Sequence, residues 1–148
     1  MMQSNGGLTA GRGNSDNALF PYCTEDKIED NASNTGSRTI IWAERNGKRY
    51  VWEPFSKTGR GLYDTTMNLY KNVVGNKLVF EEVNHDIELT FRQTWQPSER
   101  FGFVRTSTLS SQRGGATRVE VLDGIATARR LTLPPSVQRA EAFHVVDR

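Results

Sequence analysis

Residues 38–53 read RTIIWAERNGKRYVWE, and this stretch decides the fold class. Two runs rich in β-branched and aromatic residues, 38–44 and 49–53, flank Asn46-Gly47. Both turn residues tolerate a positive φ, and a turn of this kind twists in the same sense as the strands that it joins. The stretch therefore predicts a β-hairpin. Pro54 predicts the end of the second strand, because proline has no N–H to offer the ladder.

The alternation of apolar and polar residues continues away from the hairpin. It is clearest from Ile87 to Trp95, where Leu89 and Phe91 share a face with both ends of the run. A period of two residues indicates a strand with one buried and one solvated face. Further strand-forming runs occupy 67–73, 77–83, 101–109 and 117–122. Strand-forming runs that follow one another so closely, with turn signals between them, predict an all-β fold. We expect an antiparallel β-sandwich (super-sandwich-like) over residues 18–125.

The two ends of the chain differ in composition from the region between them. Residues 1–17 are rich in Gly, Ser and Asn, and they bury too little apolar surface to offset the entropy of ordering. We therefore expect a mobile, disordered N-terminus. The segment 126–148 carries four arginines and the pair Pro134-Pro135, which interrupts any helix at that point. We expect an irregular C-terminal tail there.

Composition narrows the classes of partner. The 148 residues suit one domain, and 19 basic against 17 acidic residues give a net charge of +2. This small surplus creates no strong field, so we expect neither a nucleic-acid nor a membrane partner. Cys23 is the one cysteine, which excludes an internal disulfide and a cysteine-built zinc site. The sequence shows no secretory signal and no apolar run of the roughly 20 residues that a membrane helix needs, so we expect a cytoplasmic protein.

The sequence offers no set of residues that would perform catalysis. The two histidines are His85, in a predicted turn, and His144, in the tail. Neither belongs to a metal-binding motif, so we expect no metal and no cofactor. A glycosidase needs two converging carboxylates. Glu81 and Glu82 are neighbours on a strand and point to opposite faces, so we interpret them as part of a solvated sheet face.

The tryptophans offer a binding surface instead. Sugars stack on flat aromatic faces, whereas core packing is the alternative because each tryptophan buries a large apolar area. Trp95 shares the face of Phe91, which favours the core. Trp42 and Trp52 lie on the predicted hairpin and are the candidate carbohydrate-binding residues, with core packing left open for both.

Several strings in the same order resemble one protein family. They are SDNALFPY at 15–22, GSRTIIW with GKRYVWEPFS at 36–56, NLYKNVVGNKLVFEEVNHD at 68–86, and RFGFVRTSTL followed by VEVLDG at 100–124. Together they are similar to the N-terminal β-sandwich of large bacterial proteins related to cellobiose phosphorylase and other inverting glycoside phosphorylases. The resemblance covers about residues 15–125.

The resemblance implies a role without chemistry of its own. In that family the sandwich precedes a helical (α/α)6 barrel that holds the catalytic acid and binds phosphate, and the sandwich contributes to the active-site rim and the subunit contact. No catalytic residue carries over to this chain. The implied partners are an oligosaccharide, the missing helical-barrel domain and a second copy. After Leu122-Asp123-Gly124-Ile125 the tail departs from the family pattern, which predicts a truncated or frame-shifted fragment.

The sequence therefore leaves three candidate functions open. The first is a non-catalytic N-terminal sandwich domain of a carbohydrate-active enzyme related to the glycoside phosphorylases and hydrolases. The second is a free-standing carbohydrate- or protein-binding β-module, which the strand-borne tryptophans favour. The third is a small enzyme whose acidic residues converge only in three dimensions. Turnover of glycosides or glycosyl phosphates by the isolated chain separates the third from the other two.

Overall fold

The computed structural model describes residues 11–12, 14–18, 36–112 and 117–126. These residues contain strands and turns and no helix, and every pair of neighbouring strands is antiparallel. The strands are β1 (Gly11–Arg12), β2 (Asn14–Ala18), β3 (Gly36–Arg45), β4 (Lys48–Trp52), β5 (Thr65–Lys71), β6 (Leu78–Asn84), β7 (Leu89–Ser98), β8 (Gly102–Ser111) and β9 (Arg118–Ala126). The predicted all-β, antiparallel class is confirmed and is consistent with a sandwich-like fold.

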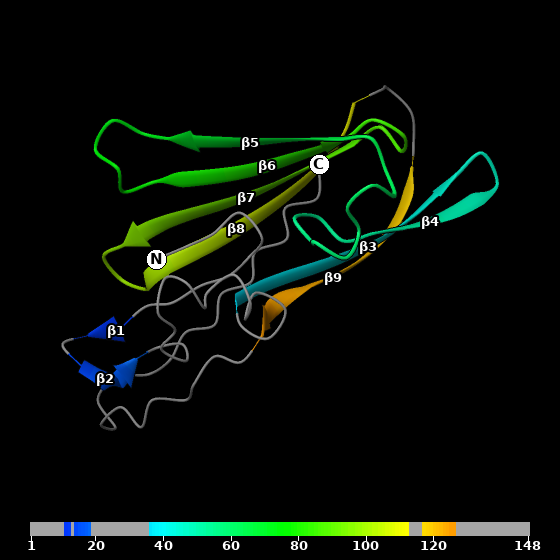
Figure 1. The fold of residues 1–148 in the computed structure, drawn as a ribbon. Helices are drawn as coiled ribbons and strands as arrows, with labels where there is room; N and C mark the ends of the chain where they lie inside the picture. The colour runs from blue at the N-terminus through cyan, green and yellow to red at the C-terminus, as the bar shows by residue number, and fades with distance from the viewer. Residues whose placement is uncertain (1–10, 13, 19–35, 113–116, 127–148) are drawn as a thin grey trace. The chain divides into compact units, whose positions relative to one another are not determined.

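The described strands belong to two compact units. The first holds the strand pair β1–β2 and a three-stranded sheet in the order β4-β3-β9. The second holds a four-stranded sheet in the order β5-β6-β7-β8, in which each strand pairs with the next one along the chain (Figure 1). The second sheet is therefore a meander of three hairpins, whereas the first brings β9 beside β3 from far along the sequence.

The hairpin β3–β4 forms as its turn residues predict. Asn46 and Gly47 have φ angles of 50° and 71°, the positive values that a tight two-residue turn requires. The register places Ile41 opposite Trp52 and Trp42 opposite Val51. Successive residues of a strand point to opposite faces, so this register separates the two tryptophans.

One face of the three-stranded sheet is buried. Ile41 and Ala43 of β3 and Trp52 of β4 all lie on it and are almost fully inaccessible to solvent. On β9 the burial ends, because Val121, which lies opposite Ile41, is 49 % exposed. Phe55, just after β4, is buried as well and has a positive φ of 65°.

The four-stranded sheet also has a clear buried face. Leu89, Phe91 and Trp95 of β7 are buried, as their alternation predicts, and Phe80 of β6 joins them. Ile87 is buried too, but it lies in the turn before β7, where Glu88 has a positive φ of 54°, so the strand begins two residues later than predicted. The core position predicted for Trp95 is thus confirmed. Removal of these apolar side chains from water is the main favourable contribution to the stability of this unit.

The strand β7 runs through Pro97, a residue type that ordinarily interrupts a strand. Pro97 pairs only with β8, because the pairing of β6 with β7 ends at Trp95, so the missing N–H removes no bond to β6. Within the segment 1–17 the structure describes β1 and most of β2. The tail beyond residue 126 lies outside the described residues.

The substitution Phe91→Ala tests the core of the meander. Phe91 is 2 % exposed, so truncation leaves a cavity and should lower the free energy of unfolding by about 3–5 kcal/mol. Leu69→Ala, at an exposed position of β5 in the same sheet, is the control and should change it by about 0.5 kcal/mol or less. Urea unfolding followed by circular dichroism measures both. Equal losses in the two variants would contradict the assignment of this core.

Candidate functional site

The two candidate tryptophans occupy opposite faces of the first sheet. Trp52 is 2 % exposed and packs in the core, which leaves its ring no surface for a ligand. Trp42 is partly exposed on the other face of β3. The core-packing alternative therefore describes Trp52, and Trp42 is the residue whose ring a ligand can reach.

Trp42 borders a cavity of about 170 Å³ that is open to solvent. Its lining comes from all three strands of the sheet: Trp42, Ala43, Glu44, Arg49, Arg118 and Glu120. The register explains why these residues meet. Trp42 lies opposite Glu120, and Glu44 lies opposite both Arg49 and Arg118, so two adjacent rows of side chains surround the ring.

An ion pair crosses the sheet beside Trp42. Arg49 Nη2 of β4 lies 2.8 Å from Glu120 Oε2 of β9, so the pair spans the central strand β3. Both side chains are more than half exposed, and an exposed pair of this kind adds little to stability. Its consequence is positional: it holds hydrogen-bonding groups at the border of the cavity, next to the aromatic ring.

The charged residues of this cavity are ones that the sequence does not single out. Glu44 and Arg49 adjoin the predicted turn and look like ordinary solvated residues. Arg118 and Glu120 join them only because β9 pairs with β3, a contact between segments far apart in the chain. Alternation along each strand gives the face on which a residue lies, but only the pairing of β3 with β9 shows that these four surround Trp42.

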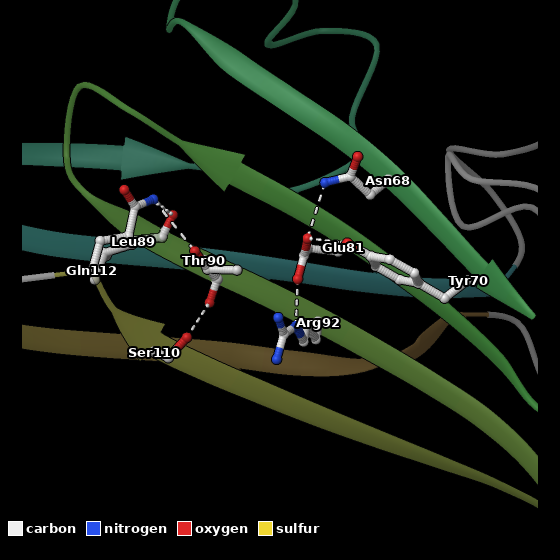
Figure 2. A network of polar contacts seen from close by, with 8 residues as sticks. All are labelled: Asn68, Tyr70, Glu81, Leu89, Thr90, Arg92, Ser110 and Gln112. Carbon is white, nitrogen blue, oxygen red and sulfur yellow. Dashed lines mark hydrogen bonds and ion pairs between the residues drawn. The ribbon is translucent and has the colours of Figure 1, made fainter.

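A second polar cluster lies on the four-stranded sheet, around Glu81. Glu81 Oε1 accepts hydrogen bonds from Asn68 Nδ2 at 2.9 Å and from Tyr70 Oη at 3.0 Å. Glu81 Oε2 accepts one from Arg92 Nε. Figure 2 shows these side chains converging on the carboxylate from β5 and β7, the two neighbours of β6. Asn68, Glu81 and Arg92 form one cross-strand row.

This cluster keeps a nearly buried carboxylate ionised. Burial by itself raises the pKa of Glu81, which is 4 % exposed, but the hydrogen bonds from Arg92, Asn68 and Tyr70 outweigh it and lower the pKa below the ordinary value of 4.5. The hydrogen bond to Glu81 raises the pKa of Tyr70 above 10.0. At neutral pH the network therefore pairs a carboxylate with a guanidinium and with a neutral phenol.

The interpretation of Glu81 and Glu82 as a solvated face is wrong. The two side chains do lie on opposite faces, yet each is only 4 % exposed. Asn68, Tyr70 and Arg92 cover Glu81, and they come from strands whose register the acidic pair alone does not reveal. The signal that points to this cluster is the alternation of polar residues at positions 68 and 70, read together with the turn that follows β5.

A smaller polar contact joins β7 to the end of β8. Gln112 Nε2 donates to Thr90 Oγ1 at 3.3 Å and to the carbonyl of Leu89 at 3.4 Å (Figure 2). Ser110 Oγ lies 3.5 Å from the carbonyl of Thr90. These long, weak hydrogen bonds connect the two strands at one end of the β7–β8 hairpin. They bring no reactive side chain to the polar cluster around Glu81.

The remaining candidate groups offer no metal chemistry in the part of the chain that the structure describes. His85 is exposed in the turn after β6, as predicted, with Nε2 2.9 Å from Thr66 Oγ1. No group of His, Cys, Asp and Glu side chains suited to a metal ion occurs among the described residues. Cys23 and His144 lie outside them.

The described residues include no helix that is long and apolar enough to cross a membrane.

Comparison with known proteins does not assign the chain to a family. No protein-family model matches the chain, and no curated protein matches it either. The strings that resemble the glycoside phosphorylases fall largely in the hairpins β3–β4 and β5–β6 and in β8 and β9. Residues 19–22 of the first string lie outside the described residues. The resemblance therefore stays a prediction from sequence.

The substitution Glu81→Gln tests the buried carboxylate. Because the folded-state pKa of Glu81 is lowered, its stabilising contribution is complete above the unfolded-state pKa and is lost as the pH falls through the folded value. The free energy of unfolding of the unmodified protein should therefore fall more steeply than that of Glu81→Gln between about pH 5 and pH 3. Urea unfolding at a series of pH values measures both slopes.

Glu99→Gln is the matched control, because Glu99 is an exposed turn residue with no hydrogen bond or ion pair among the described residues. This variant should keep the slope of the unmodified protein. Parallel curves for the unmodified protein and Glu81→Gln would show that the Glu81 network does not couple stability to pH.

Proposed function

We propose that this protein is a carbohydrate-binding β-domain whose ligand stacks on Trp42 at the open face of the sheet β4-β3-β9. The observation that carries the proposal is the placement of Trp42: the residue is partly exposed, and it borders an open cavity beside the ion pair of Arg49 and Glu120. An aromatic face with polar groups at its border matches a sugar, which has an apolar C–H face and hydroxyl groups around its rim.

The charges around Trp42 favour a neutral ligand. The cavity is lined by two arginines and two glutamates, so their formal charges cancel. A site for phosphate or another anion would present an excess of positive charge. Guanidinium groups donate hydrogen bonds and carboxylates accept them, and a sugar hydroxyl can do both. The lining therefore suits the hydroxyls of an uncharged saccharide.

The size of the cavity favours recognition of part of a chain. Its volume of about 170 Å³ lies below the range of roughly 300–1,000 Å³ typical of pockets that enclose a small molecule. A shallow open site of this size contacts one sugar unit and leaves the rest of a longer glycan outside. We therefore expect an oligosaccharide to bind through a single stacked unit at Trp42.

A second candidate function concerns the partner of the domain. The strings quoted from the sequence favour a non-catalytic N-terminal sandwich of a glycoside phosphorylase-like enzyme, and the all-β architecture of the described residues is compatible with it. In that role the partner is a helical-barrel domain or a second copy of the chain. Analytical ultracentrifugation of the isolated chain tests self-association, and a monomer at high concentration would count against the second copy.

Removal of the Trp42 ring should weaken sugar binding at this site. We expect gluco-oligosaccharides to shift the tryptophan fluorescence saturably, and Trp42→Ala to weaken binding at least about tenfold, the loss typical of a central aromatic contact. Trp42→Phe keeps a smaller ring and should retain part of the affinity. Isothermal titration calorimetry measures the three affinities independently of fluorescence.

Phe103→Ala is the control, since Phe103 is an exposed aromatic residue in the other compact unit. This variant should bind as the unmodified protein does. The proposal fails if no oligosaccharide binds to protein that circular dichroism shows to be folded, or if Trp42→Ala binds as tightly as Phe103→Ala.

A further inference from the structure

The four-stranded sheet carries a second polar surface, on the face that includes Glu81. Arg92 lies opposite Thr108, and Thr94 lies opposite Thr106. Because alternate residues of a strand share a face, these four side chains form a block of two by two on β7 and β8. We call this block, together with Tyr70 on β5, the threonine face.

The hydrogen-bonding groups of this block are available to a ligand. Glu81 engages Arg92 through Nε only, and the Arg92 side chain is 55 % exposed. Among the described residues, the two Nη atoms of Arg92 and the hydroxyls of Thr94, Thr106 and Thr108 have no side-chain partner. The face thus presents a guanidinium edge and three hydroxyls that water satisfies in the free protein.

Glu81 orients Arg92 and Tyr70, the two residues of the threonine face that contact it. Its carboxylate fixes Arg92 through Nε and Tyr70 through the phenol hydroxyl at 3.0 Å, as Figure 2 shows. The Tyr70 ring is half exposed. A ligand therefore meets a guanidinium and an aromatic ring that are already held in place, which reduces the entropy lost on binding.

We infer that the threonine face binds a neutral polysaccharide chain running across the strands from Tyr70 to Thr106. Tyr70, Thr94 and Thr106 belong to one cross-strand row, with Val79 between the first two. Strands in a sheet lie about 4.8 Å apart, so the row spans roughly 14 Å from β5 to β8. This length accommodates about three linked hexoses, one over the Tyr70 ring and the others over the threonine hydroxyls.

The charge of the face selects a neutral chain over an acidic one. The carboxylate of Glu81 lies in direct contact with Arg92, so an incoming anion meets both charges and gains little net attraction. Hydroxyl groups, by contrast, can accept from Arg92 and can donate to or accept from each threonine. This site is independent of Trp42, because the two belong to different compact units.

The experiment measures binding in the full chain with Trp42→Ala, so that the sugar site at Trp42 cannot contribute. Cellohexaose, maltohexaose and xylohexaose are the probes, and isothermal titration calorimetry is the readout. At least one hexaose should bind, and across the shorter oligomers of the same series the affinity should rise with chain length up to about three sugar units and then level off. Raising the salt concentration should leave the affinity unchanged, because the ligand carries no charge.

Adding Thr106→Val and Thr108→Val removes two hydroxyls and keeps the β-branched shape that the strand prefers. These substitutions should weaken hexaose binding about tenfold, the effect of losing two ordinary hydrogen bonds. Thr65→Val, in β5 on the opposite face of the same sheet, is the control and should bind unchanged. Circular dichroism confirms that each variant is folded.

The inference is overturned if no hexaose binds to the folded Trp42→Ala protein, or if Thr106→Val with Thr108→Val binds as tightly as Thr65→Val. It is also overturned if heparin binds in a salt-dependent manner and the neutral hexaoses do not, because the surface then selects acidic chains. Loss of binding in Trp42→Ala with binding retained in the unmodified protein would reject the threonine face and leave the Trp42 site standing.

Discussion

The antiparallel pairing of β3 with β4 and β9 is the constraint on which the candidate site depends. The backbone ladder fixes which residues lie opposite one another, and the period of two then assigns each side chain to a face. A shift of one residue between β3 and β4 would place Trp42 and Trp52 on the same face. The observed register places Trp52 with Ile41 in the core and leaves Trp42 with Arg49 and Glu120 at an open cavity.

In the four-stranded sheet, the main constraint is the burial of a charged side chain, Glu81. The face of this sheet around Glu81 contains a carboxylate almost fully removed from water, a costly arrangement unless the charge is paired and hydrogen-bonded. Asn68, Tyr70 and Arg92 supply those bonds, and in doing so they lose freedom themselves. The same contacts that compensate for burial therefore orient the groups that a ligand would meet.

The two proposed binding surfaces share their chemistry. The Trp42 cavity combines an aromatic ring with cancelling charges, and the threonine face combines the Tyr70 ring with a neutralised guanidinium and hydroxyls. Each offers an apolar platform and hydrogen-bonding groups without an excess of charge. Both proposals of an uncharged saccharide ligand rest on this shared chemistry, and each has its own test.

The sequence by itself determined the elements that depend on neighbouring residues. Asn46-Gly47 requires a tight turn, so the hairpin β3–β4 was predictable, and the alternation from Leu89 to Trp95 identified a buried face because period two follows from strand geometry. Only the tertiary structure decided which residues meet across strands. The pairing of β9 with β3 brought Glu120 to Trp42, and the pairing of β5 and β7 with β6 buried Glu81, because these contacts join segments whose relative register no local pattern specifies.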